Sequence, residues 1–144
     1  MSDTTLVLGI KVTILSEEKI EKLITDSLTQ SRKDALRRNI FTPNPEMLAS
    51  SDSNTKFKEV LNSSFLNIPD GWGVVWASRG AIKERITGVD LMEHLTIIAG
   101  KNGWRVFLLG SLPGVAKEAE KKLMSEFLGK IIGKKEFEEL DCDV

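Results

Sequence analysis

The fold is indicated most clearly by residues 65–77, which read FLNIPDGWGVVWA. The apolar run Phe65 to Ile68 ends at a proline and an aspartate, and Gly71 and Gly73 then lead into a second apolar stretch. A short apolar run bounded by turn residues is typical of a buried strand, and the glycines predict a tight turn into a helix. We therefore expect a strand, a turn and a helix in direct succession.

Strands and helices are also expected to alternate before this stretch. Leu6 to Leu15 predicts two short strands or a hairpin, and Ser16 offers an N-cap for a helix that follows. Asn39 to Phe41 predicts a short buried strand. Asn44 precedes a proline, which is the usual order of an N-cap and a first helical residue, and we expect the polar residues Ser50 to Thr55 to interrupt this helix.

The same alternation continues toward the C-terminus. The predicted elements are a helix from Val89 to Ala99, a strand from Trp104 to Leu109, a helix from Pro113 to Phe127 and a weak strand from Lys130 to Gly133. Strands separated by helices imply βαβ units. The sequence therefore predicts an α/β fold with a mostly parallel sheet flanked by helices.

The composition excludes several classes of function. The 144 residues carry a net charge of −1, which provides no basic surface for nucleic acid. The single cysteine, Cys142, and the single histidine, His94, exclude an internal disulfide and the usual zinc sites. No apolar run approaches the roughly 20 residues that span a bilayer, and Met1 to Thr5 lacks a signal-peptide pattern. We therefore expect a cytoplasmic protein.

Three polar clusters directly follow predicted strands. They are Thr42 to Asn44, Pro69 to Gly71, and Gly110 with Ser111. In open α/β sheets, ligands bind beyond the carboxyl ends of the strands, and each cluster also opens a helix whose free N–H groups suit a phosphate or a carboxylate. The topology therefore points to a shared ligand site, with Gly110 and Ser111 on its rim.

Asp70 is the main candidate for a catalytic group, because a carboxylate at a strand end can accept a proton from a substrate hydroxyl. The alternative is that Asp70 only caps the helix that follows, and the local pattern by itself favours the cap. Asn44 has the same alternative as a helix cap. Gly110 and Ser111 could cradle a phosphate, but a simple helix start explains them as well.

Two further features allow two interpretations each. Arg85 could hold a diphosphate through two hydrogen bonds, or it is a solvated charge in a loop. Trp72 and Trp76 lie one helical turn apart. We expect them to pack together or against the core rather than to form a platform for a sugar.

Four motifs occur in an order and at a spacing that resemble one known family. They are Thr42 to Met47 (TPNPEM), Ile68 to Ala77 (IPDGWGVVWA), Glu84 to Leu91 (ERITGVDL) and Phe107 to Ala116 (FLLGSLPGVA). In succession they resemble the motifs of the WecG/TagA/CpsF family, which is glycosyltransferase family 26. The resemblance covers Leu6 to Gly133, nearly the whole chain.

The resemblance implies a Rossmann-like α/β fold and a transferase that needs no metal. Members of this family move a sugar such as N-acetylmannosamine or N-acetylmannosaminuronic acid from a UDP-sugar donor to polyprenyl-diphosphate-linked N-acetylglucosamine. Their products enter enterobacterial common antigen, wall teichoic acid linkage units or capsule. The protein would then be a hexosyltransferase of cell-envelope or exopolysaccharide biogenesis, with no nucleic-acid partner.

The resemblance also implies roles for single residues. The aspartate of the P-D-G motif, which is the proposed base, falls on Asp70, and Gly71 follows it in the same pocket. Thr42 and Asn44 of the T-P-N motif line that pocket, and the arginine before T-G-x-D falls on Arg85. The implied reaction is a direct inverting displacement in which Asp70 deprotonates the acceptor hydroxyl.

The chain departs from the family pattern toward its C-terminal end. Members continue with a motif like G-x-P-K-Q-E and a C-terminal appendage that associates with the membrane, and neither has a match here. We expect residues 1–133 to form the N-terminal portion of the transferase domain, with an incomplete sheet, and residues 134–144 to be a loose charged tail. Such a chain is expected to self-associate as a homo-oligomer or to be only marginally stable, and to show little or no activity by itself. Peripheral contact with the inner face of the plasma membrane would belong only to a full-length form.

The rival interpretation comes from a different class of protein. The chain would then be a non-catalytic α/β remnant that binds a sugar nucleotide or a partner chain without turnover.

Overall fold

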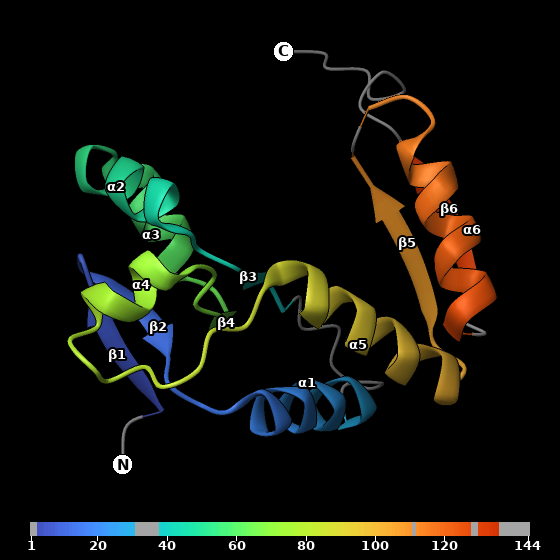
Figure 1. Cartoon of the computed structure of the whole chain (residues 1–144), viewed down its shortest axis with the longest axis horizontal. Coiled ribbons are helices and arrows are strands. Elements are labelled where there is room, and N and C mark those ends of the chain that lie inside the picture. Colours follow the sequence, from blue (N-terminus) through green and yellow to red (C-terminus); the bar gives the residue numbers. More distant parts are fainter. Residues whose placement is uncertain (1–2, 31–37, 111, 128–129, 136–144) are drawn as a thin grey trace. The chain divides into compact units, whose positions relative to one another are not determined.

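A computed structural model of the chain describes residues 3–30, 38–110, 112–127 and 130–135, which form two compact units (Figure 1). The first unit comprises residues 1–91 and the second residues 92–144. The first contains β1 (Thr4–Val7), β2 (Ile10–Thr13), α1 (Glu17–Gln30), β3 (Ile40–Phe41), α2 (Pro45–Ser53), α3 (Thr55–Asn62), β4 (Leu66–Asn67), α4 (Trp72–Ala77) and the start of α5 (Gly88–Lys101). The second contains the rest of α5, β5 (Arg105–Leu109), α6 (Val115–Phe127) and β6 (Lys130–Lys135).

The described strands pair into three two-stranded sheets. β1 and β2 are antiparallel, so the segment from Leu6 to Leu15 contributes to a hairpin, one of the two forms expected for it. β3 pairs with β4 and β5 pairs with β6, and both of these pairs are parallel. Parallel neighbours need a crossover connection, and helices supply it in both cases. The predicted α/β fold class is therefore confirmed.

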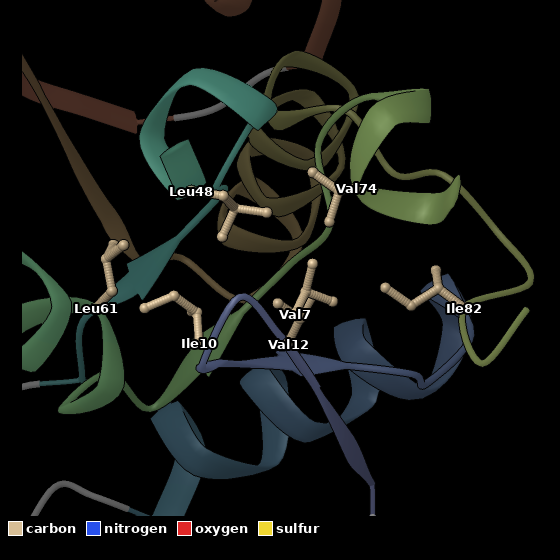
Figure 2. Packing of buried hydrophobic residues seen from close by; sticks show 7 residues of the cluster. All are labelled: Val7, Ile10, Val12, Leu48, Leu61, Val74 and Ile82. Atoms are coloured by element: carbon tan, nitrogen blue, oxygen red, sulfur yellow. The ribbon is translucent and has the colours of Figure 1, made fainter. Parts of the chain in front are cut away.

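The core of the first unit lies between the hairpin and helices α2, α3 and α4. Side chains from both strands of the hairpin, from the three helices and from the loop after α4 converge there, as Figure 2 shows. The buried members are Val7, Ile10, Val12, Leu48, Leu61, Val74 and Ile82. Burial of these aliphatic side chains positions α2 and α4, and both helices begin next to predicted site residues.

A buried amide ties the hairpin to the parallel pair. Asn67, the last residue of β4, is 3% exposed, and its Nδ2 donates to the carbonyls of Lys11 at 2.8 Å and Leu61 at 2.7 Å. Lys11 belongs to β2 and Leu61 to α3. Because a buried donor that loses its acceptors costs free energy, these two bonds restrict where β4 can lie against the hairpin.

The predicted interruption over Ser50 to Thr55 is wrong in its extent. α2 continues to Ser53, and only Asn54 separates it from α3. Ser51 is fully buried, and its hydroxyl donates to the Leu48 carbonyl at 2.7 Å, so a polar residue is accommodated inside the helix. Asn54 begins α3 because its side chain accepts a hydrogen bond from a backbone N–H of that helix.

Trp72 and Trp76 do not pack into the core. Their exposed fractions are 66% and 85%. The short helix α4 turns Val74 inward, and residues two positions away from Val74 lie roughly 200° around the helix axis. Both indoles therefore point away from the core, so packing against the core, one of the two arrangements expected for them, is wrong.

The second unit has the strand, helix and strand expected from the sequence. β5, α6 and β6 each begin within two residues of the predicted start. β6 extends to Lys135, and residues 136–144 lie outside the described part of the chain, so the loose tail stays a prediction. Phe107 and Leu109 of β5 are more than half exposed, and the predicted self-association is likewise untested.

No helix in the described ranges is both long enough and apolar enough to cross a membrane.

Asn67→Asp should strongly destabilise the first unit. The substitution replaces the Nδ2 donor group with an oxygen that faces two carbonyls, so two hydrogen bonds are lost and a charge is buried without a partner. We expect the free energy of unfolding, measured by urea titration of the full chain, to fall by about 3–5 kcal/mol. Asn39→Asp makes the same chemical change at an exposed position and should cost less than about 0.5 kcal/mol. Equal losses in the two variants would contradict the role assigned to Asn67.

Candidate functional site

The candidate site lies where the parallel strands β3 and β4 end. Phe41 and Asn67 are paired as the last residues of these strands. Beyond them the backbone pairing continues, because the Ile68 N–H donates to the Phe41 carbonyl at 2.8 Å and the Asp70 N–H donates to the Pro43 carbonyl at 3.1 Å. The two strand ends therefore stay side by side as far as Asp70.

Asn44 begins α2 from this edge. Its Oδ1 accepts a hydrogen bond from the Met47 N–H at 2.8 Å, and Pro45 occupies the first helical turn. An asparagine followed by proline is a favourable start for a helix, since proline lacks the N–H that would otherwise need a partner. The helix-cap interpretation of Asn44 is therefore confirmed, and any contact of Asn44 with a ligand stays a prediction.

Asp70 does not cap the helix that follows it. The N-cap of α4 is Gly71, with a φ of 100°, and it provides no side-chain hydrogen bond. The Oδ2 atom of Asp70 instead accepts a hydrogen bond from the Gly88 N–H at 3.4 Å, 18 residues further along the chain. Gly88 is the first residue of α5. The alternative in which Asp70 merely starts its own helix is therefore wrong.

Two glycines let the chain after Asp70 lie against the start of α2. A Cβ atom on Gly73 would come within 2.7 Å of Pro45 Cγ, which is closer than real Cβ contacts allow. Gly71 has a left-handed φ and would place its Cβ 3.4 Å from Pro45 Cδ. This close approach holds the Asp70 turn directly beside the T-P-N segment.

The segment before α5 completes the site. The Ile86 N–H donates to the Pro69 carbonyl at 3.4 Å, which places this segment next to the residue before Asp70. On the other side, a Cβ on Gly88 would lie 3.0 Å from Thr42 Oγ1. Thr42, Asp70 and Gly88 therefore meet at one edge of the sheet.

The arrangement suits proton transfer at a surface. Asp70 is half-buried, and among the described residues Gly88 is the one that donates to its side chain. Oδ2 is thus engaged by the protein, whereas Oδ1 can accept a hydrogen bond from a bound hydroxyl. Thr42 adds a half-buried hydroxyl beside Gly88. A carboxylate held in this way can act as a general base toward a substrate.

Comparison with known proteins assigns this chain to a family. The family model described as "Glycosyl transferase WecG/TagA/CpsF family" matches residues 5–138. This chain belongs to the WecG/TagA/CpsF glycosyltransferase family. It is also 36% identical over 91 residues to the N-acetylglucosaminyldiphosphoundecaprenol N-acetyl-beta-D-mannosaminyltransferase of Bacillus subtilis (strain 168). The alignment covers 61% of this chain but only 36% of that relative, so it spans little more than a third of the relative's length.

The family resemblance drawn from the four motifs is thereby confirmed, and the structure brings several of its residues together. Thr42, Asn44, Asp70 and Gly71 lie at the ends of β3 and β4. Arg85 is exposed, in the loop one residue before Ile86. The function of each residue in this glycosyltransferase family member stays a prediction.

Two predicted site residues lie elsewhere in the chain. Gly110 follows β5 in the second unit, where it is buried and has a φ of 101°. Ser111 lies outside the described residues. Their expected place on the rim of the Asp70 site is therefore untested.

Gly88 is the contact that the sequence patterns did not single out. It lies within the quoted stretch from Glu84 to Leu91, but only as a spacer between other motif residues. A local signal existed, because a threonine followed three residues later by an acidic residue is typical of a helix start. Thr87 does cap α5, with its Oγ1 accepting from the Asp90 N–H at 3.1 Å. No local pattern specifies that the N–H of Gly88, the residue after Thr87, faces Asp70.

Substitution of Asn44 should separate its role as a cap from any role in binding. Asn44→Ala removes the acceptor for the Met47 N–H and should lower the free energy of unfolding by about 1 kcal/mol. Asn44→Asp keeps an acceptor at the same place and should restore most of that stability in a urea titration. An alanine variant as stable as the unsubstituted chain would contradict the capping role. Weaker binding of a UDP-sugar by a stable Asn44→Ser variant, which keeps a capping oxygen and adds no negative charge, would show an additional contact with the ligand.

Proposed function

We propose that this chain carries the base-bearing part of a glycosyltransferase that moves an N-acetylmannosamine-type sugar from a UDP-sugar to polyprenyl-diphosphate-linked N-acetylglucosamine. The observation that carries the proposal is the placement of Asp70, which is half-buried at the carboxyl end of β4 and has one oxygen held by Gly88. The name of the Bacillus subtilis relative supports the substrates, because it specifies an N-acetylmannosaminyl group and an N-acetylglucosaminyl-diphosphoundecaprenol acceptor. The product would enter a cell-surface polysaccharide such as the teichoic acid linkage unit.

The reaction is a single inverting displacement. Asp70 accepts the proton of the acceptor hydroxyl as that oxygen forms a bond to the anomeric carbon of the donor sugar. The bond from the anomeric carbon to the diphosphate breaks on the opposite face, and its electron pair leaves with UDP. The relative's name describes a β-linked product, which inversion of an α-linked donor produces.

Substrate contacts are supplied by groups around Asp70. The Thr42 hydroxyl, which lies beside Gly88, would hydrogen-bond the acceptor sugar, and Asn44 and Gly71 border the same edge of the sheet. Arg85 is exposed, and in the proposed reaction it would hold the diphosphate through two parallel hydrogen bonds and offset the charge that develops on the leaving UDP. Gly110 and Ser111 would contribute further donors to a phosphate.

The proposed transfer uses no metal ion. Within the described residues, Asp70 does not belong to any group of three or more histidine, cysteine or acidic side chains close enough to share a metal. The charge of the leaving diphosphate is then met by Arg85 and backbone N–H groups. Addition of EDTA to the transfer assay should therefore leave the rate unchanged within about two-fold, whereas loss of a Lewis acid would cost several kcal/mol of transition-state stabilisation. A rate that falls with EDTA and returns with Mg²⁺ would contradict this part of the proposal.

Asp70→Asn should abolish most of the transfer. The amide keeps the size of the side chain and an oxygen that can accept from the Gly88 N–H, but it cannot take a proton. We expect turnover to fall by about a hundred- to ten-thousand-fold. Because the chain is expected to show little activity by itself, the assay uses a version completed with the C-terminal part of a family member. The substrates are UDP-N-acetylmannosamine and a lipid-diphosphate-linked N-acetylglucosamine acceptor, with thermal melting as the control for folding.

Two outcomes would argue against the enzyme. Near-normal turnover in Asp70→Asn with unchanged melting would remove Asp70 from the role of base. Tight UDP-sugar binding without transfer, in the chain and in a version completed with the C-terminal part of a family member, would favour the non-catalytic alternative.

A further inference from the structure

The first turn of α5 has backbone donors that need partners from outside the helix. The first N–H groups of any α-helix have no acceptor within it. In α5 the Thr87 side chain takes the Asp90 N–H at 3.1 Å, and the Thr87 carbonyl takes the Leu91 N–H at 3.1 Å. The Gly88 N–H is left to the Asp70 carboxylate. Asp70 is therefore linked to a helix start that a different residue already caps.

The backbone around Asp70 is held against the same two neighbouring segments. The Asp70 N–H donates to the Pro43 carbonyl, and the carbonyl of Pro69 accepts from the Ile86 N–H. With its main chain fixed on both sides, the Asp70 side chain has few ways to turn. The additional bond from Gly88 to Oδ2 selects one orientation of the carboxylate plane.

Glycine occupies position 88 because a side chain there would be crowded by Thr42, and not because the backbone conformation requires it. Its φ lies outside the left-handed range, so other residues can adopt the same backbone. A Cβ would, however, approach Thr42 Oγ1 to 3.0 Å and Thr42 Cγ2 to 3.4 Å. The absence of a side chain thus lets α5 begin close enough to Thr42 for its first N–H to reach Asp70.

We propose that Gly88 is a positioning residue whose N–H holds Asp70 Oδ2, so that Oδ1 is presented to the acceptor hydroxyl. This inference rests on the proposed function of Asp70 as the base. The hydrogen bond is long, at 3.4 Å, and catalytic hydrogen bonds of this kind tighten when substrate is bound. We expect this hydrogen bond to increase the rate of the chemical step rather than the affinity for substrate.

Gly88→Pro and Gly88→Ala form a matched pair of variants. Both add a Cβ next to Thr42, but only proline removes the N–H. Proline is well tolerated at the first position of a helix, and an N-cap residue such as Thr87 typically has the extended backbone that a residue before proline prefers. We expect kcat of Gly88→Pro to be about ten-fold below that of Gly88→Ala, the low end for a hydrogen bond to a charged group, with KM changed by less than about two-fold. Equal kcat values for the two variants, with equal melting temperatures, would overturn the proposal.

A second measurement does not depend on activity. Hydrogen exchange followed by NMR reports on the Gly88 and Asp90 amides of the full chain. In Asp70→Ala the Gly88 amide should exchange about ten-fold faster than in the unsubstituted chain, since its acceptor is gone, while the Asp90 amide, bonded to Thr87, should be unchanged. An unchanged Gly88 amide would overturn the positioning role even if transfer cannot be detected.

The two proposals fail in different ways. If Asp70→Asn keeps normal turnover, the function proposed for Asp70 fails regardless of Gly88. If Asp70→Asn is inactive while Gly88→Pro and Gly88→Ala behave alike, Asp70 remains the base and only the positioning role of Gly88 is lost.

Discussion

The site depends on the way backbone pairing continues past the ends of β3 and β4. Pro43 and Pro69 are both buried just beyond these strands, and both use their carbonyls as acceptors, from Asp70 and Ile86 respectively. Proline has no N–H, so neither residue leaves a buried donor without a partner at a place where the regular ladder has stopped. The strands can therefore end while their extensions remain parallel and close. The position of Asp70 follows from this pairing.

At two glycines, helices that begin near the strand ends come close to neighbouring segments, and this brings the site residues together. Gly73 allows α4 to lie on Pro45 at the start of α2, and Gly88 allows α5 to begin beside Thr42. At both positions the need is for space, since neither glycine has a left-handed φ. Gly71 differs, because its φ of 100° is a conformation that other residues rarely adopt. Gly73 and Gly88 are thus needed for space, whereas Gly71 is needed for its backbone conformation.

The elements of the fold could be predicted from local patterns, whereas the contacts between them could not. Apolar runs predict the strands and helices, and prolines and glycines predict where they end, as at Phe65 to Gly73. These patterns depend only on residues that are neighbours in sequence. The orientation of Trp72 and Trp76 depends instead on which face of α4 meets the core, and the single small residue Val74 decides it. The partner of Asp70 lies 18 residues away, so a local pattern favoured the wrong helix for it.

The local structure around Gly71 explains why the Asp70 side chain remains available at all. An aspartate directly before a helix would ordinarily accept from the free N–H groups of the first turn. Here the turn at Gly71 moves the chain so that the Gly71 carbonyl takes the Val74 N–H at 3.1 Å and the Val75 N–H at 3.4 Å. α4 thus begins without any side-chain cap, and the Asp70 carboxylate is not committed to its own helix. A base needs one oxygen held in place and another free to meet a proton, and Asp70 has its Oδ2 held by the Gly88 N–H of a different helix. The glycine turn therefore separates the start of α4 from Asp70, so the carboxylate of this strand-end residue is not used by its own helix.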